Sequence, residues 1–364
     1  MQRSLALMHS PSRRHALATA GAWLVAGSGL LTPCSNAARS LETASRPLIK
    51  PPRLRRGDLV ALVSPSGWIS EELLERAYRN LESLGLRVKL GLHALARSGN
   101  YAGTLKERLA DLHAAFRDPN VRAIWPARGG SGAAMLLPHL NWSLVRANPK
   151  IVIGYSDLTA LLVGLYRHAR LVAFHGPVAS SQFLPETRAA LEAVLFEGAP
   201  LVHVAVPEAQ RERARTNPED APRTLGSGTA EGPLVGGNLS VIASLIGTPD
   251  AAPLAGHLLF LEDVGEAPYR LDRMLFQLQQ SHGFERIRGL ALGVFRRSSD
   301  PDAAQGPKHT LAQVLEERFA AIEVPAAYGL PFGHIAPQGV LPLGIRAQLD
   351  ADRHTLTLLE SAVN

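Results

Sequence analysis

Short apolar runs alternate with helix-like segments through the first half of the chain. Leu59 to Val63 is an apolar run with β-branched residues, and Ser64 to Gly67 follow as a loop, so a strand is predicted here. From Glu71 to Leu86, apolar residues recur at helical spacing and predict a helix. Alternation of this kind favours a parallel sheet with helices on both faces. Further strands are predicted at 88–92, 121–125 and 151–154, and further helices at 105–116 and 158–168.

The pattern changes after about residue 185. Residues 207–232 are polar, contain several Pro and Gly, and show no periodicity, which predicts a linker or an exposed loop. We therefore expect an α/β fold with an N-terminal domain at 57–185, a linker at 186–232 and a C-terminal domain at 233–364. The second unit is predicted to contain strands at 257–262, 290–295 and within 341–359, and helices at 239–246, 269–281 and 311–320.

The first 38 residues have the pattern of a targeting segment. Arg13-Arg14 precede an uncharged run at 16–31, which is 16 residues long and so shorter than the ~20 residues of a membrane span. Paired arginines before an apolar run resemble a twin-arginine export signal, so residues 1–38 predict export to the periplasm and no membrane segment in the mature chain. A retained anchor or a lipidated Cys34 is the alternative. Residues 39–56 are expected to form an extended lead-in.

Composition and charge narrow the class of protein. The chain has 364 residues, of which 46% are apolar, and this is too apolar for a disordered protein. Its single cysteine excludes a disulfide framework and a cysteine-based metal site. The net charge of +6 falls to +3 when residues 1–38 are set aside, because they hold three arginines and no acid. This lower charge removes most of the argument for nucleic acid as a partner, and none is expected.

A serine directly follows the strand predicted at 151–154. The sequence Gly154-Tyr155-Ser156-Asp157 places Ser156 at a strand-to-helix turn, and ligands bind at the carboxyl ends of parallel strands. The helix N-terminus adds free N–H groups that suit an oxyanion. The turn is similar to a nucleophile elbow, although the Gly-x-Ser-x-Gly pattern is incomplete. A simple helix N-cap at Ser156 or Asp157 is the alternative.

A glycine-rich segment follows the strand predicted at 121–125. Consecutive glycines in Arg128-Gly129-Gly130-Ser131-Gly132 let the main chain approach a ligand closely and point N–H groups at it. The segment has neither the Walker spacing nor the dinucleotide-binding spacing. The segment could form half of an oxyanion hole, and a plain turn is the alternative interpretation.

A carboxylate and an imidazole follow two later strands. Glu262 ends the apolar strand at 257–262, and His334 lies in a loop beside Gly and Pro. Taken singly, an exposed acid and an ordinary histidine explain them. Together with Ser156 they are the parts of an acyl-transfer triad, in which the serine needs a base and the base needs a carboxylate.

Five short motifs follow one another along the chain. They are Arg128-Gly129-Gly130, Gly154-Tyr155-Ser156-Asp157, Gly236-Gly237-Asn238-Leu239, Leu261-Glu262-Asp263 and Pro331-Phe332-Gly333-His334. In this order they resemble the LD-carboxypeptidases, the muramoyltetrapeptide carboxypeptidase family, which also includes the microcin C immunity peptidases. The resemblance covers about residues 55–360, and five ordered motifs are far more specific than any one of them.

The resemblance implies a fold and a catalytic triad. An N-terminal parallel-sheet α/β domain carries Ser156 as the nucleophile, and a smaller C-terminal α/β domain carries Glu262 and His334. The active site lies in the cleft between the two domains. In this arrangement Ser156 attacks the peptide carbonyl and His334 relays the proton.

The resemblance also implies roles for residues around the triad. Main-chain N–H groups of Gly129 or Gly130, together with that of Asp157, are the implied oxyanion donors. Ser131 stands where the family often has Tyr. Asn238 is a predicted substrate contact, with a helix entry turn as the alternative reading of Gly-Gly-Asn.

The implied reaction is hydrolysis of the bond between meso-diaminopimelate and terminal D-alanine in murein tetrapeptides, with no metal or organic cofactor. Within the family, the alternative is cleavage of a peptidyl-nucleotide antibiotic such as microcin C, against which secretion argues, because that toxin is processed in the cytoplasm. A second alternative comes from another functional class. An exported chain with two domains around a cleft is also typical of a periplasmic solute-binding protein, which needs no triad. The sequence leaves a homodimer open.

Overall fold

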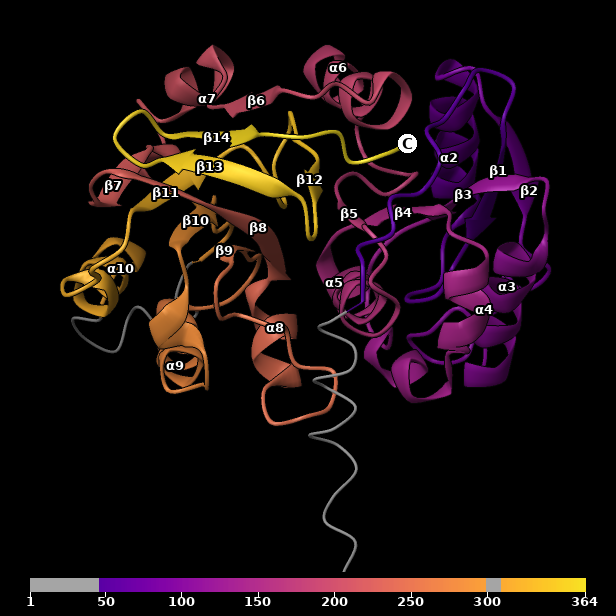
Figure 1. Ribbon diagram of the computed structural model, residues 1–364, viewed down its shortest axis with the longest axis horizontal. Helices are drawn as coiled ribbons and strands as arrows, with labels where there is room; N and C mark the ends of the chain where they lie inside the picture. Colours follow the sequence, from indigo (N-terminus) through magenta and orange to yellow (C-terminus); the bar gives the residue numbers. More distant parts are fainter. Residues whose placement is uncertain (1–45, 299–308) are drawn as a thin grey trace, which may run out of the picture.

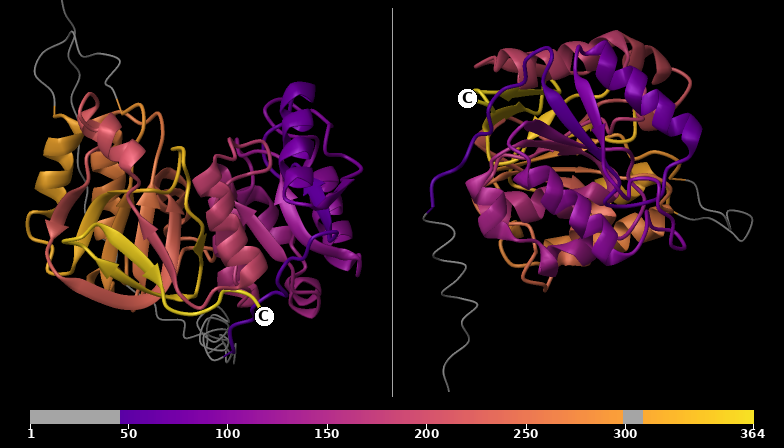
Figure 2. Two further views of the ribbon diagram at one scale, coloured as in Figure 1. Left: turned by 90° about the horizontal axis from the view of Figure 1, so that it is seen from above. Right: turned by 90° about the vertical axis from the view of Figure 1, so that its right-hand side faces the viewer.

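The computed structural model describes residues 46–298 and 309–364, which form two lobes that lie side by side, each built around one β-sheet (Figures 1 and 2). The export signal predicted at 1–38, with Cys34, lies outside the described residues. In the described part of the predicted lead-in, residues 46–56 form no helix or strand, and Ile49 forms an isolated bridge with Leu171.

The sheet of the first lobe is parallel except at one edge. Its strand order is β12-β5-β4-β3-β1-β2, and β12 pairs antiparallel with β5. Apolar side chains fill β1, β3 and β4, which are almost wholly buried, as strands covered on both faces require. The strands are β1 (Leu59–Val63), β2 (Arg87–Leu90), β3 (Val121–Pro126), β4 (Ile151–Gly154), β5 (Phe174–His175) and β12 (Leu341–Pro342).

Two long helices of the first lobe begin at capping side chains. Thr104 and Glu107 form the predicted capping box of α3, and Ser70 caps α2. The helix predicted at 158–168 is an α-helix flanked by a 3₁₀ turn and a π turn. The elements are α2 (Glu71–Ser83), α3 (Leu105–Arg117), η1 (Ala134–His139), α4 (Trp142–Ala147), η2 (Ser156–Leu158), α5 (Thr159–Gly164) and η3 (Leu165–Ala169).

The linker predicted at 186–232 is wrong, because most of this segment is regular structure and its strands belong to the sheet of the second lobe. Its short strands pair with strands far along the chain, β6 with β14 and β7 with β11, so local sequence carries little trace of them. The elements are α6 (Pro185–Leu191), η4 (Glu192–Glu197), β6 (Val202–Ala205), α7 (Glu208–Arg213), η5 (Pro218–Asp220), β7 (Arg223–Gly226) and β8 (Thr229–Asn238).

The sheet of the second lobe has eight strands, in the order β6-β14-β13-β8-β9-β10-β11-β7. The central strands β8 to β11 are parallel, and the outer ones are antiparallel. The α/β fold with two sheets is confirmed, and the strands from 186–232 make this sheet the wider one. The remaining elements are α8 (Leu239–Leu245), β9 (Leu258–Glu262), α9 (Pro268–Gln279), η6 (Phe284–Arg286), β10 (Gly289–Gly293), α10 (Leu311–Phe319), β11 (Ala326–Leu330), β13 (Arg346–Asp350) and β14 (Thr355–Leu358).

The lobes meet where α5 packs on β8 and α8 (Figure 1). A Cβ atom on Gly237 would lie 2.5 Å from the Thr159 side chain, so the two main chains approach closely at this point. The Asn238 main-chain N–H donates to Thr159 Oγ1 over 2.9 Å. The chain also ties the lobes through its end, because Asn364 pairs with Pro51 and Arg53. Among the helices of residues 46–298 and 309–364, none combines the length and the apolar content needed to cross a bilayer.

Candidate active site

Ser156 sits at a strained turn between β4 and η2. Its φ of 64° is left-handed, a conformation that costs a non-glycine residue about 1–2 kcal/mol and is held only where the surroundings enforce it. The buried strand β4 fixes the residue before the turn, and the buried helix α5 fixes the residues after it. The turn therefore has the geometry of a nucleophile elbow, which projects the serine hydroxyl from the sheet edge.

The glycine-rich segment lies directly against this serine. A Cβ atom on Gly129 would lie 2.9 Å from Ser156 Cβ and 3.2 Å from its hydroxyl oxygen. Gly130 has a φ of 137°, and a Cβ there would lie 2.8 Å from Gly67. Only glycine lets the two loops and the elbow approach to this degree.

Three main-chain N–H groups beside Ser156 have no acceptor within the described residues. They belong to Gly129, Gly130 and Asp157, the residues predicted as oxyanion donors. Unpaired N–H groups at a helix start and in a glycine loop suit an anionic oxygen. The structure thus brings the predicted donors to the nucleophile.

The carboxylate of Asp157 ties the loops of the first lobe together. It accepts hydrogen bonds from the Ser66 hydroxyl over 2.5 Å and from the Ala133 N–H over 2.9 Å. Arg108, only 2% exposed, donates to the carbonyls of Pro65 and Gly132 over 2.9 and 3.0 Å. Burial lowers the pKa of Arg108, and the charge of Asp157 opposes this shift. Arg108 interrupts the apolar face of α3 but belongs to none of the predicted site motifs.

Glu262 and His334 form a hydrogen-bonded pair in the second lobe, with Glu262 buried and His334 partly exposed. His334 Nδ1 lies 2.6 Å from Glu262 Oε2, and the His334 main-chain N–H donates to the same oxygen over 3.2 Å. Burial of Glu262, which is 0% exposed, raises its pKa, but the charge and hydrogen bond of His334, together with His175 and the Asn238 hydrogen bond, hold that pKa below its usual value. A carboxylate in this position fixes the imidazole so that Nε2 is left to act on a substrate.

Two neighbours shape this pair. Gly333 has a φ of 92°, and a Cβ there would lie 2.5 Å from Glu262 Cγ, so the turn before His334 requires glycine. Asn238, predicted to contact substrate, is 4% exposed and donates to Glu262 Oε1 over 3.4 Å. Its side-chain oxygen accepts from the Val241 N–H and caps α8. These contacts place Asn238 as a support of Glu262.

The acids that follow Glu262 have other partners. Asp263 accepts from the main-chain N–H groups of Ser240 and Val264 over 2.8 and 2.7 Å, and burial raises its pKa to about 6. Glu266 lies 3.6 Å from Arg270 in a partly exposed ion pair. Of these acids, Glu262 is therefore the one that contacts His334.

The two halves of the site meet at Tyr155. Its ring lies 4.8 Å from the His334 ring, centroid to centroid, and the next residue is Ser156. Within the described part of the chain, no hydrogen bond joins the Ser156 hydroxyl to His334. Catalytic hydrogen bonds are often long without substrate and tighten in the substrate complex.

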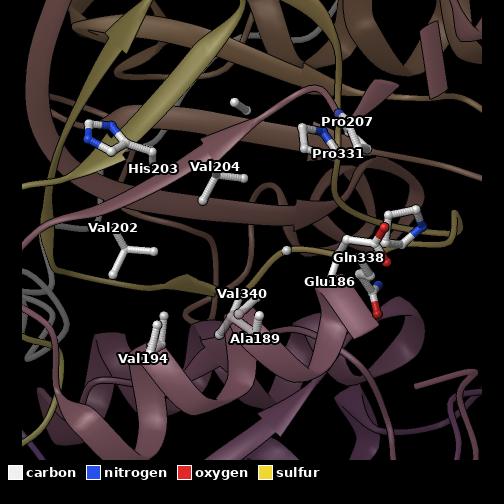
Figure 3. Close-up of a pocket in the computed structure, with 15 residues that line it drawn as sticks. Glu186, Ala189, Val194, Val202, His203, Val204, Pro207, Pro331, Gln338 and Val340 are labelled. Carbon is white, nitrogen blue, oxygen red and sulfur yellow. The ribbon is translucent and has the colours of Figure 1, made fainter. Parts of the chain in front are cut away.

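Two cavities border the loop that carries His334. The larger, of about 750 Å³, includes Tyr155 and His334 in its lining and so opens from the site. The smaller, of about 360 Å³, lies between α6 and β6 and is lined mostly by apolar side chains such as Val194, Val202 and Val340 (Figure 3). Its lining contains none of the triad candidates. Within residues 46–298 and 309–364, no group of three His, Cys, Asp or Glu side chains is placed to hold a metal ion.

Comparison with known proteins agrees with this geometry. The profile of the LD-carboxypeptidase N-terminal domain matches residues 60–176, and that of the LD-carboxypeptidase C-terminal domain matches residues 231–349. A murein tetrapeptide carboxypeptidase of Pseudomonas aeruginosa is 40% identical over 310 residues, which is 81% of this chain and 94% of the relative.

Solved structures share the whole two-lobe arrangement. An MccF-like protein of Bacillus anthracis superposes with a TM-score of 0.75 at 28% identity, covering 86% of this chain and 99% of that one. A muramoyltetrapeptide carboxypeptidase of Oxalobacter formigenes superposes with a TM-score of 0.66 at 28% identity, covering 82% of this chain and 97% of that one.

Proposed function

The chain belongs to the LD-carboxypeptidase family, and we propose that it hydrolyses the bond between meso-diaminopimelate and the terminal D-alanine of murein tetrapeptides. The family makes it a serine peptidase. The substrate is proposed from the Pseudomonas aeruginosa relative, which is named a murein tetrapeptide carboxypeptidase. The observation that carries the proposal is the pair of His334 and the buried Glu262, which the Tyr155 ring connects to the strained Ser156 turn.

In the proposed mechanism the triad acts in two steps. His334 Nε2 takes the proton of the Ser156 hydroxyl as its oxygen attacks the diaminopimelyl carbonyl, and Glu262 stabilises the imidazolium that forms. His334 then gives that proton to the amine of D-alanine, which leaves. Water, activated by the same imidazole, releases the tripeptide from the acyl-enzyme and restores the Ser156 hydroxyl.

The unpaired amides of Gly129, Gly130 and Asp157 are proposed to bind the oxyanion of both tetrahedral intermediates. Each such donor contributes most when the charge develops, because its direction is fixed before the reaction begins. Asp157 and Arg108 support this role, since their hydrogen bonds hold the loops that carry the amides.

Residues 1–38 support an exported enzyme that meets murein in the periplasm. The paired arginines and the uncharged run that follows are the basis of this part of the proposal. Lipidation of Cys34 and a homodimer stay predictions.

Alanine release from three synthetic peptides tests the proposed substrate. L-Ala-γ-D-Glu-meso-diaminopimelyl-D-Ala is expected to be cleaved at least ~10²-fold better, by kcat/KM, than its terminal L-Ala epimer or its C-terminal amide. In the epimer, the methyl group and the carboxylate of the terminal alanine exchange directions. The amide lacks the negative charge of the terminal carboxylate. Each change therefore removes contacts with the protein. Comparable rates on all three would leave a broader serine hydrolase.

A second activity is considered because the Bacillus anthracis structure is of an MccF-like protein. The same preparation is therefore given a peptidyl-nucleotide conjugate of the microcin C type. Cleavage of the conjugate but not of the tetrapeptide would move the assignment to the immunity peptidases. Binding of either compound without any turnover by the protein with intact Ser156 would instead favour a solute-binding protein.

A further inference from the structure

The larger cavity has a wall built by arginines. Besides Tyr155 and His334, its lining includes Arg213 at the end of α7 and Arg296 and Arg297 after β10. We refer to these three residues as the arginine wall. Arg297 has a φ of 54°, a left-handed conformation that a non-glycine residue keeps only where its surroundings enforce it.

Cations outnumber acids around this wall. Glu219 also lines the cavity, and Asp220 lies beneath it, 1% exposed. The Asp220 carboxylate is 3.0 Å from Arg296 Nη1 and 3.5 Å from Arg213 Nε. Two acids thus face three guanidinium groups, and the wall keeps a net positive charge that favours an anion.

Arg296 is held in place from two sides. Its main-chain N–H donates to the carbonyl of Asp263 over 3.0 Å, and its carbonyl accepts from the Gly265 N–H over 2.8 Å, so it lies beside the chain that follows Glu262. Its side chain, 24% exposed, is oriented by the buried Asp220. A guanidinium group fixed in this way loses little conformational entropy when it binds a carboxylate.

The segment that carries Glu219 and Asp220 is anchored to the sheet. The Tyr328 hydroxyl donates to the Glu219 carbonyl over 2.8 Å. The Gln210 side-chain amide donates to the carbonyls of Gly329 and Asp220 over 2.6 and 3.3 Å. The segment beside the arginine wall is therefore held by hydrogen bonds to β11, the strand that leads to His334.

The position of the wall selects one side of the substrate. His334 gives its proton to the leaving amine, so the leaving residue lies on the His334 side of Ser156, whereas Gly129 packs against Ser156 itself. The cavity shares His334 and extends away from it. We infer that Arg296, with the other two arginines of the wall beside it, binds a carboxylate of the peptide substrate, and that this is the terminal carboxylate of the leaving D-amino acid. The inference rests on the proposed function and gives the carboxypeptidase its requirement for a free C-terminus.

Replacement of Arg296 tests the subsite. Arg296→Gln is expected to lower kcat/KM on the free-acid tetrapeptide by about 10- to 100-fold, mostly through KM, because a charge-assisted hydrogen bond is lost. Its loss on the C-terminal amide should be at least tenfold smaller, so discrimination between acid and amide collapses. Arg296→Lys should recover part of the preference for the free acid over the amide, since lysine keeps the positive charge but lacks the two parallel N–H donors of a guanidinium group.

The buried Asp220 needs its own control. Arg296→Gln leaves that carboxylate with one partner fewer, so Arg296→Gln/Asp220→Asn, which removes both charges, is measured in parallel and should show the same loss of discrimination. Arg353→Gln is the matched control, because the Arg353 side chain is 84% exposed and is not part of the lining of the cavity. It should behave as wild type on both peptides.

The outcomes separate the subsite from the function. If wild type cleaves the tetrapeptide and Arg296→Gln loses activity equally on acid and amide, the subsite is overturned and the function stands. A third peptide, amidated at the side-chain carboxylate of diaminopimelate, identifies the other source of a carboxylate. If that amidation, and not the terminal one, cancels the effect of Arg296→Gln, the assignment to the terminal carboxylate is overturned. If wild type cleaves none of the peptides, the proposed function fails, and the subsite fails with it.

Discussion

The two lobes build their halves of the active site by different means. In the first lobe the work is done by the main chain, through the left-handed Ser156, the unpaired amides and glycines that admit close approach. In the second lobe it is done by side chains, through the buried carboxylate of Glu262 and the imidazole of His334. The first half is therefore sensitive to shape, and the second half is sensitive to charge.

This difference has a physical origin. A developing oxyanion is stabilised by dipoles that point at it before the reaction, and main-chain N–H groups held in rigid loops supply them. A general base must instead change its charge during the reaction, so it needs a partner whose own charge is fixed. The low pKa of Glu262 meets that need, because the group stays ionised in the buried site.

The largest effect is expected where the two halves meet. Ser156→Ala should lower kcat by ~10⁴-fold or more and leave the fold intact, because it removes the only group that both halves act on in the proposed mechanism. Steady-state alanine release and a thermal melt measure the two quantities. A folded Ser156→Ala protein that keeps a tenth of wild-type activity would rule out the covalent mechanism.

The charge-sensitive half is probed by two matched glutamates. Glu262→Gln keeps the shape and removes the charge, and it should lower kcat by about 10³- to 10⁴-fold. Glu266→Gln should change kcat by less than about threefold, because Glu266 pairs with Arg270 instead of His334. The two variants are assayed side by side on the tetrapeptide. The reverse order of damage would move the catalytic carboxylate to Glu266.

The shape-sensitive half is probed by two matched glycines. Gly129→Ala adds a methyl group 2.9 Å from Ser156 Cβ and should lower kcat by about 10- to 100-fold with little change in KM. Gly256→Ala has open space around its Cβ but a φ of 77°, so it should cost about 1–2 kcal/mol of stability and leave kcat unchanged. Equal activities of the two variants would show that shape beside Ser156 is unimportant.

The central elements of both sheets could be predicted from sequence, because their strands are continuous apolar runs. The strand at 59–63 has the predicted bounds, and the helix after Thr104 begins at its capping box. The segment 186–232 could not be predicted in the same way. Strands such as β7 are short and half-exposed, and their pairing partners lie more than 100 residues further along the chain.

Some features of the candidate site could also be predicted from the sequence, and others could not. The chemistry of Ser156, Glu262 and His334 follows from residue type at strand ends, and the motifs of the family add to it. The left-handed φ of Ser156 and the carboxylate contacts of Asp157 depend on tertiary packing, so no local pattern reports them. Arg108 did leave a signal, because a charged residue stands on the apolar face of α3 beside Leu105 and Leu112. Arg296 left no such signal in the sequence, since its ion-pair partner Asp220 lies 76 positions earlier.

The pairing of β12 with β5 delays the completion of the sheet in the first lobe. Leu341 and Pro342, from near the end of the chain, close the edge of the sheet that the earliest strands begin. During synthesis that edge stays open until nearly all of the protein has emerged, and an open edge invites association with other chains. Contacts that span so much sequence also slow folding, because the loop must close before they form. The first lobe, although its strands are made first, therefore stays incomplete until residues 341–342 emerge, shortly before β13 and β14 supply the last strands of the second lobe.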